Sequence, residues 1–173
     1  MAREDRNCND MVSRVFERVR MSQSQQASTR LPELLRHEFD FFEEITLRYS
    51  DNDANGHVNN AHYYSFFDTA VDAFLKKYDY RKFIAGPLQT FVVGSDCRYF
   101  REVSSPGNIQ VGVKIGRIGN STVTYFLGVF NEDDPSRPAA QGTFTHCCVT
   151  RATKRPAPVP DDLRALVALT ILK

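Results

Sequence analysis

The sequence has no tryptophan, no surplus of either charge and no long apolar run. Lysine and arginine total 22 and the acids total 21, so the basic surplus typical of nucleic-acid-binding proteins is missing. No apolar stretch reaches the roughly 18 residues of a membrane-spanning helix, and no secretory apolar region is evident. We therefore expect no nucleic-acid partner, no membrane span and a cytoplasmic location, with mitochondria as the alternative.

Cysteine is scarce, and its spacing does not fit a metal site. The four residues are Cys8, Cys97, Cys147 and Cys148, and none forms a C-x-x-C pair. This spacing excludes a zinc knuckle or a thioredoxin-like redox motif. We expect reduced, buried thiols, no metal site and no cofactor.

The length of 173 residues suits one domain with flanking segments. We predict an N-terminal extension and linker over 1–38, a main domain over 39–152 and a C-terminal tail with a short helix over 153–173. Apolar residues recur at helical spacing between Met11 and Val19, so a short amphipathic helix is expected there. Five arginines in the first 20 residues suit organelle targeting, but four acids in the same stretch argue against it.

The main domain reads as one strand, one long helix and four further strands. The helix is predicted over 58–78, where apolar residues cover most of the circumference, so other structure should wrap around it. Asn59 or Asn60 can serve as its N-cap. The strands are predicted over 41–49, 90–102, 109–118, 121–131 and 139–151. Because consecutive strands with short turns pair antiparallel, the class is α+β, with five antiparallel strands around the helix.

A dense polar loop lies between the first strand and the helix. It contains Asp51, Asp53, Asn55, His57, Asn59 and Asn60. A purely structural turn with a helix cap would explain one or two of these residues but not all of them. A calcium loop fits the opening Asp51–Gly56, yet the twelfth position is His62 rather than the bidentate glutamate that calcium needs.

A hydrolytic site is the third interpretation of this loop. A carboxylate before a helix start faces unpaired N–H groups, which can polarise a carbonyl oxygen and stabilise an oxyanion. The carboxylate can then attack the carbonyl carbon or activate a water. Asn55 and His57 can orient the water or the substrate.

The pattern Tyr49-x-Asp51-x-Asp53-x-x-Gly56-His57-Val58-x-Asn60-x-x-Tyr63 resembles the signature of hotdog-fold acyl-CoA thioesterases of the 4-hydroxybenzoyl-CoA thioesterase type. The likeness continues through Phe66-Phe67-Asp68-Thr69-Ala70 and covers roughly residues 40–152. It implies a hotdog fold and hydrolysis of an acyl-CoA or acyl carrier protein thioester. It also implies a homodimer or homotetramer, with part of the acyl pocket supplied by the partner chain.

The resemblance also implies roles for individual residues. Asp53 would be the nucleophile or general base, and a backbone N–H near Asn60 would hold the thioester oxygen. Gly119, Asn120 and Ser121 would lie near the CoA phosphates, although Arg117 is the only basic residue close to them in sequence.

A second likeness supports Asn55 and His57. The set Asp53-x-Asn55-x-His57 is similar to the Asp-Asn-His set of the plant acyl-ACP thioesterases. The further acid of those enzymes has no clear counterpart, and Asp96 is the nearest candidate.

Two other activities stay open. Hotdog enoyl-CoA hydratases pair an Asp and a His five positions apart, whereas Asp53 and His57 are four apart, which favours hydrolysis. A non-catalytic domain that binds acyl groups or serves only in assembly is the other alternative.

Overall fold

The computed structural model describes residues 33–79 and 86–165. The helix expected between Met11 and Val19 lies outside these ranges. The described elements are η2 (Arg36–Glu38), β1 (Phe41–Thr46), η3 (Tyr49–Asp51), α2 (Asn60–Lys77), β2 (Leu88–Tyr99), β3 (Asn108–Ile118), β4 (Thr122–Asn131) and β5 (Ala140–Thr150). Residues 161–165 are helical as well. Within the described ranges, none of the helices has the length and apolar character that a bilayer crossing requires.

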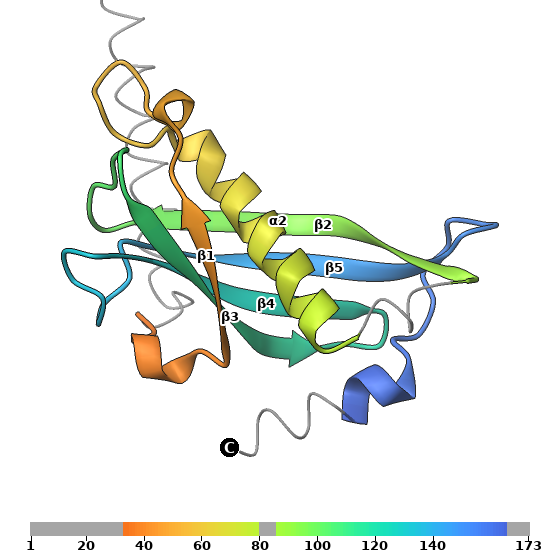
Figure 1. Ribbon diagram of the computed structural model, residues 1–173. Coiled ribbons are helices and arrows are strands. Elements are labelled where there is room, and N and C mark those ends of the chain that lie inside the picture. The colour runs from red at the N-terminus through yellow and green to blue at the C-terminus, as the bar shows by residue number, and fades with distance from the viewer. Residues whose placement is uncertain (1–32, 80–85, 166–173) are drawn as a thin grey trace, which may run out of the picture. The chain divides into compact units, whose positions relative to one another are not determined.

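One sheet and one long helix make up the domain. The strand order is β1-β3-β4-β5-β2, and every neighbouring pair is antiparallel. Helix α2 lies across one face of this sheet (Figure 1). The predicted α+β class, with five antiparallel strands and one long helix, is therefore confirmed.

Helix α2 begins at a capped end and buries its apolar side. The Asn59 side chain accepts a hydrogen bond from the Ala61 N–H at 3.0 Å, which satisfies one of the free donors of the first turn. Lys76 and Lys77 occupy the last turn, where cations favour the helix dipole. The buried side chains face the sheet and are Tyr63, Phe66, Phe67, Ala70, Val71, Phe74 and Leu75.

The first strand is shorter than predicted. It ends at Thr46, Leu47 and Arg48 lie outside the strand, and Tyr49 begins η3. The Asp51 carboxylate accepts the Arg48 backbone N–H at 2.8 Å, and this bond curls the chain into a turn. The alternation of apolar residues in the sequence continues past the end of β1, because the local hydrogen bond to the Asp51 side chain overrides the preference of these residues for extended structure.

The prediction that consecutive strands pair is wrong for β2 and β3. Strand β2 pairs with β5 and forms one edge of the sheet, whereas β3 pairs with β1 and β4. The connection between them, residues 100–107, passes the start of α2, where the Val58 N–H donates to the Val103 carbonyl at 2.7 Å. A connection of eight residues, longer than a hairpin turn, allows this crossover.

Candidate active site

The polar loop before α2 is held by its own backbone. The Asp53 N–H donates to the His57 carbonyl at 2.8 Å, and the Gly56 N–H donates to the Asp53 carbonyl at 3.0 Å. Gly56 has φ +84°, a backbone conformation that residues with a Cβ rarely adopt. The loop is therefore a closed turn that holds the residues around Asp53 in a fixed conformation.

Asp51 serves the structure of the loop. Its side chain is 1% exposed and lies 2.8 Å from the Arg48 guanidinium. Burial by itself would raise the pKa of Asp51, but hydrogen bonds and charge from Arg48 lower that pKa overall. Asp51 would be the first calcium ligand in the calcium interpretation, but its carboxylate is already paired with Arg48. The described residues contain no group of three His, Cys, Asp or Glu side chains that would suit a metal.

Asp53 faces a surface cavity of about 380 Å³. Its Oδ1 accepts the Asn55 backbone N–H at 2.7 Å, while the Asn55 side-chain amide lies farther off, 3.4 Å from Oδ2. The carboxylate is thus oriented mainly by a backbone donor. The cavity lining brings together three of the four predicted catalytic residues, and its members are Asp53, His57, Val58, Asn60, Tyr63, Tyr99, Phe100, Arg101, Glu102 and Val103.

His57 points to an acid that the sequence pattern did not reveal. Its Nε2 lies 3.1 Å from Glu102 Oε2, on the connection between β2 and β3. Asp96, the acid suggested by sequence, is instead hydrogen-bonded by the Thr143 hydroxyl. Glu102 was missed because only the crossover connection brings it to the loop.

The start of α2 completes this cavity. The Asn60 N–H donates no hydrogen bond to any residue in the part of the chain that the structure describes, so this donor is available to a ligand. The Tyr99 hydroxyl donates to the Asn60 carbonyl at 3.2 Å. Burial raises the pKa of Tyr63 to about 12 and that of Tyr99 still further, so both phenols remain protonated at neutral pH.

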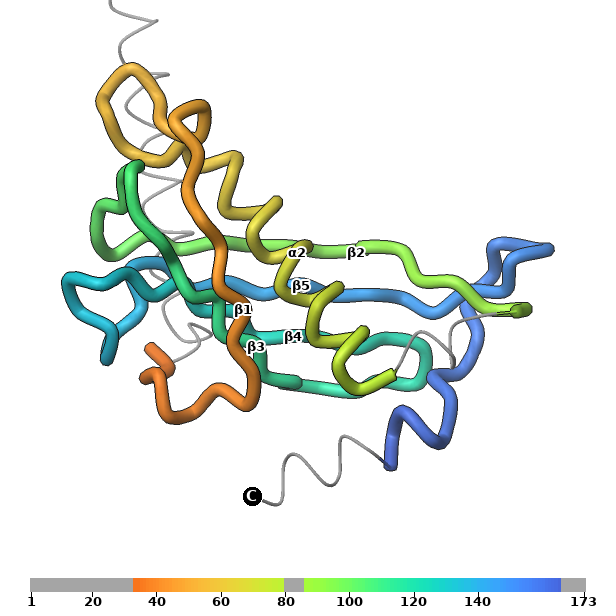
Figure 2. The backbone as a smooth tube through the Cα atoms, viewed as in Figure 1, coloured from red at the N-terminus to blue at the C-terminus, as the bar shows by residue number. Residues whose placement is uncertain are grey.

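The turn of Gly119, Asn120 and Ser121 lies elsewhere. It joins β3 to β4 at the far end from the polar loop, as Figure 2 shows. Strand β3 has 11 residues, so the two regions are separated by about 35 Å at about 3.3 Å per residue. The Arg164 guanidinium donates to the carbonyls of Gly119 and Asn120, both at 2.7 Å. The Arg164 guanidinium therefore places a positive charge beside this turn, which the positions of basic residues in the sequence did not reveal.

The model of the thioesterase-like superfamily matches residues 47–167. The chain belongs to this superfamily. The match covers the polar loop, α2 and the four strands after it. The predicted hotdog fold and the predicted thioesterase family are therefore both confirmed.

Individual proteins are also similar to this chain. The thioesterase-like chain is 40% identical to the PA5185 protein from Pseudomonas aeruginosa strain PAO1, with a TM-score of 0.72 over 80% of this chain and 96% of that one. It is 29% identical over 98 residues to the uncharacterized protein YsmA of Bacillus subtilis (strain 168); the match covers 56% of this chain and 66% of YsmA. Slr0204 from Synechocystis, a 1,4-dihydroxy-2-naphthoyl-CoA thioesterase, shares the fold at 15% identity, with a TM-score of 0.66 over 74% of this chain and 95% of that one.

Proposed function

We propose that this protein hydrolyses acyl thioesters of CoA, or of acyl carrier protein, to the free acid and the thiol. One observation carries the proposal: Asp53 and Asn60, whose N–H donates to no acceptor among the described residues, line the same cavity. Thioester hydrolysis needs both a group that attacks or activates water and a donor for the carbonyl oxygen. Superfamily membership supports the same reaction class.

Two routes use these groups. In the first, the Asp53 carboxylate attacks the carbonyl carbon, the C–S bond breaks and the thiolate leaves; water then hydrolyses the anhydride and regenerates Asp53. In the second, Asp53 takes a proton from water, whose oxygen attacks the carbonyl carbon, and the proton passes to the departing thiolate. In both routes the Asn60 N–H donates to the carbonyl oxygen as negative charge develops there.

His57 and Asn55 act as positioning groups in this proposal. Asn55 orients the Asp53 carboxylate through its backbone N–H. His57 lines the cavity and is itself oriented by Glu102. An imidazole fixed on one side can present its other nitrogen to a water or to the substrate.

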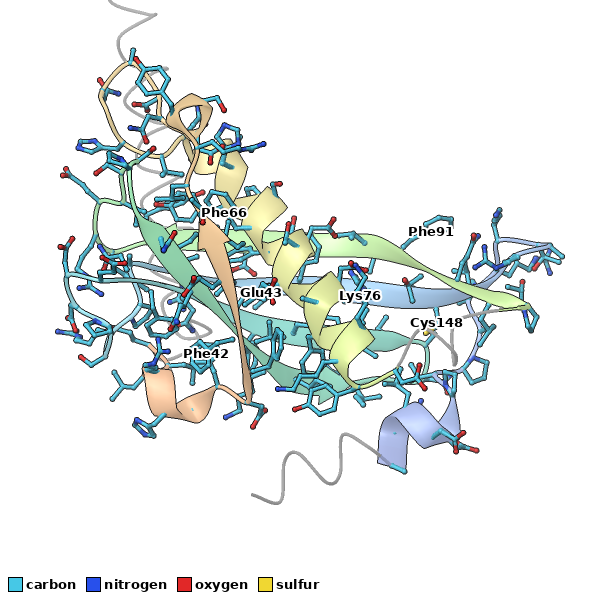
Figure 3. All side chains as sticks on the ribbon, in the orientation of Figure 1. Phe42, Glu43, Phe66, Lys76, Phe91 and Cys148 are labelled. Carbon is cyan, nitrogen blue, oxygen red and sulfur yellow. The ribbon has the colours of Figure 1, made fainter. Side chains whose placement is uncertain are left out.

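We propose a homodimer or homotetramer in which copies associate along β2. Strand β2 is an edge strand of 12 residues, and among the described strands it pairs only with β5. Phe91, Val92 and Val93 are 47%, 48% and 60% exposed on it. Figure 3 shows Phe91 standing off β2 on the side away from β5. An unpaired apolar edge invites a further strand, and a second copy supplies an identical one.

The turn of residues 119–121 fits this arrangement as a CoA contact. It lies too far from Asp53 for one small site within one chain, so we assign it to a chain other than the one that supplies Asp53. Arg164 and the exposed Arg117 give the turn positive charge suited to phosphates.

Thiol release from a panel of acyl-CoAs tests the proposal. The wild type is expected to release thiol from at least one member, and Asp53→Asn is expected to lose about 10²-fold or more in kcat. Asp162→Asn removes an exposed carboxylate far along the chain and serves as the control. Equal rates for Asp53→Asn and the wild type would overturn the mechanism.

The same panel separates the alternatives. Acyl-CoA binding without turnover would identify a binding domain, and water addition to an enoyl-CoA without thiol release would identify a hydratase. A covalently acylated Asp53, detected by mass spectrometry of enzyme quenched during turnover, would select the nucleophile route.

A further inference from the structure

A cavity of about 900 Å³ lies on the face of the sheet opposite α2. The ring of Phe41 packs against Phe74 of α2, at 5.8 Å between centroids. Because neighbouring residues of a strand point to opposite faces, Phe42 points away from the helix, and it lines this cavity. The cavity shares no residue with the Asp53 cavity, and its volume falls in the range of small-molecule sites. We call it the outer cavity.

One wall of the outer cavity is fixed by a ring that lies on two glycines. Gly112 of β3 and Gly128 of β4 are register partners. A Cβ on Gly112 would lie 2.8 Å from Phe39 Cγ, and a Cβ on Gly128 would lie 2.8 Å from Phe39 Cζ. The Phe39 ring therefore lies directly on the strand backbones and anchors the end of η2. The Arg36 N–H, at the start of η2, donates to the Ser136 carbonyl at 3.1 Å. Both ends of this wall are thus held in place.

Arg36 brings an uncompensated positive charge to the outer cavity. Its guanidinium lies 4.1 Å from the centroid of the Phe42 ring and 5.5 Å from that of Phe130, and Figure 3 shows Phe42 beside η2. The guanidinium donates to Gln110 Oε1. Within the part of the chain that the structure describes, no ion pair joins Arg36 to a carboxylate. Because a guanidinium has several N–H donors in a planar fork, donors remain for a planar acceptor such as a carboxylate.

The rest of the lining restricts the chemistry of the ligand. Arg137 also lines the outer cavity, but Glu33 pairs with it through two hydrogen bonds of 3.1 and 3.2 Å. Leu35, which is 38% exposed, and the Phe42 ring supply apolar surface. A phosphate, with a charge of about −1.5 to −2, would exceed the one uncompensated cation. A single carboxylate joined to an apolar body matches both the charge and the apolar surface.

We propose that the outer cavity is a second binding site, for an amphiphilic monocarboxylate. Its carboxylate pairs with Arg36, and its apolar body lies against Leu35 and Phe42. The free acid that thioester hydrolysis would release belongs to this chemical class. The inference depends on the outer cavity alone, so it does not rest on the proposed function.

The absence of tryptophan from the sequence allows a probe that reports on this site alone. Phe42→Trp introduces the only tryptophan of the chain and keeps an aromatic face for Arg36. Titration of this variant with octanoate is expected to give a saturable change in tryptophan fluorescence. Octanol has a similar apolar body without the charge, so it is expected to bind at least about tenfold more weakly.

A charge-removing variant tests the role of Arg36. In the Phe42→Trp background, Arg36→Gln is expected to weaken octanoate binding by about tenfold or more and to leave octanol binding unchanged, because only the carboxylate meets the guanidinium. Arg155→Gln removes an exposed guanidinium that does not line the outer cavity, and it should change neither affinity.

Three results would each overturn the proposed site. They are the lack of a saturable fluorescence change with octanoate, equal affinities for octanoate and octanol, and an unchanged octanoate affinity in Arg36→Gln. If Phe42→Trp does not fold, Leu35→Trp places the probe on the same lining. If Arg36→Gln does not fold, Arg36→Lys keeps the charge without the planar fork and should bind octanoate more weakly.

The same titrations in an Asp53→Asn background separate this inference from the proposed function. Asp53 does not line the outer cavity, so octanoate binding there is expected to be unchanged. A protein that cleaves no thioester but binds octanoate through Arg36 would contradict the proposed hydrolysis only. A protein that cleaves thioesters but fails the titrations would contradict the outer site only.

Discussion

Asp51 and Asp53 are two residues apart, yet their carboxylates have opposite surroundings. Asp51 is 1% exposed and paired with Arg48, whereas Asp53 lines a surface cavity. The buried carboxylate holds the turn in shape, and the other is left accessible for chemistry. The two acids should therefore differ in what their removal does, and this difference can be measured.

Asp51→Asn is expected to destabilise the protein by about 1.5–3 kcal/mol at pH 7, because charge-assisted hydrogen bonds to Arg48 are lost. The pKa of Asp51 is lowered by folding, so its contribution is present above the unfolded pKa of about 3.9 and disappears as the pH falls through the folded value. Urea unfolding from pH 7 down to pH 3 should show the difference from wild type shrinking. A constant difference across this range would contradict the assigned role.

Asn55→Ala is expected to cost less activity than Asp53→Ala, by about tenfold or more. The reason is that the shorter contact to Asp53 Oδ1 comes from the Asn55 backbone N–H, which alanine retains. Thiol-release kinetics of both variants provide the measurement. Equal losses would show that the side-chain amide is what matters.

Glu102→Gln is expected to lower kcat/KM by about two- to tenfold, because the carboxylate that orients His57 is lost. Since both groups act together, the double variant with His57→Ala should be no slower than His57→Ala by itself. Glu132→Gln, an exposed acid on the β4–β5 connection, is the control. Independent, additive effects of the two substitutions would argue against a working His57–Glu102 pair.

Gly142→Ala is expected to destabilise the domain by about 1–3 kcal/mol through overpacking. A Cβ at Gly142 would meet the Asp96 carbonyl oxygen and lie 2.7 Å from Phe67 Cε2, at the contact between α2 and the sheet. Gly94→Ala is the matched control, since its Cβ would meet nothing closer than 4.0 Å. Thermal unfolding of both variants tests this expected destabilisation, and equal melting temperatures for the two variants would contradict it.

The sequence by itself determined the elements and the character of the polar loop. Hydrophobic periodicity placed α2 and the four later strands to within a few residues, because burial of one side of each element leaves a repeat along the chain. The pattern around Asp53 and Gly56 resembles the signature of the thioesterase family, and the match to the superfamily model confirms that prediction.

Only the tertiary structure decided which distant residues meet. Glu102 reaches His57 because the β2–β3 connection crosses the start of α2, and Arg164 reaches Gly119 from 45 residues away. The surroundings of His146, on β5, likewise depend on packing between α2, β2 and β5, and its Nδ1 has no hydrogen-bond partner among the described residues. Sequence periodicity reports the face on which a residue lies, whereas its neighbours depend on strand order and crossover connections.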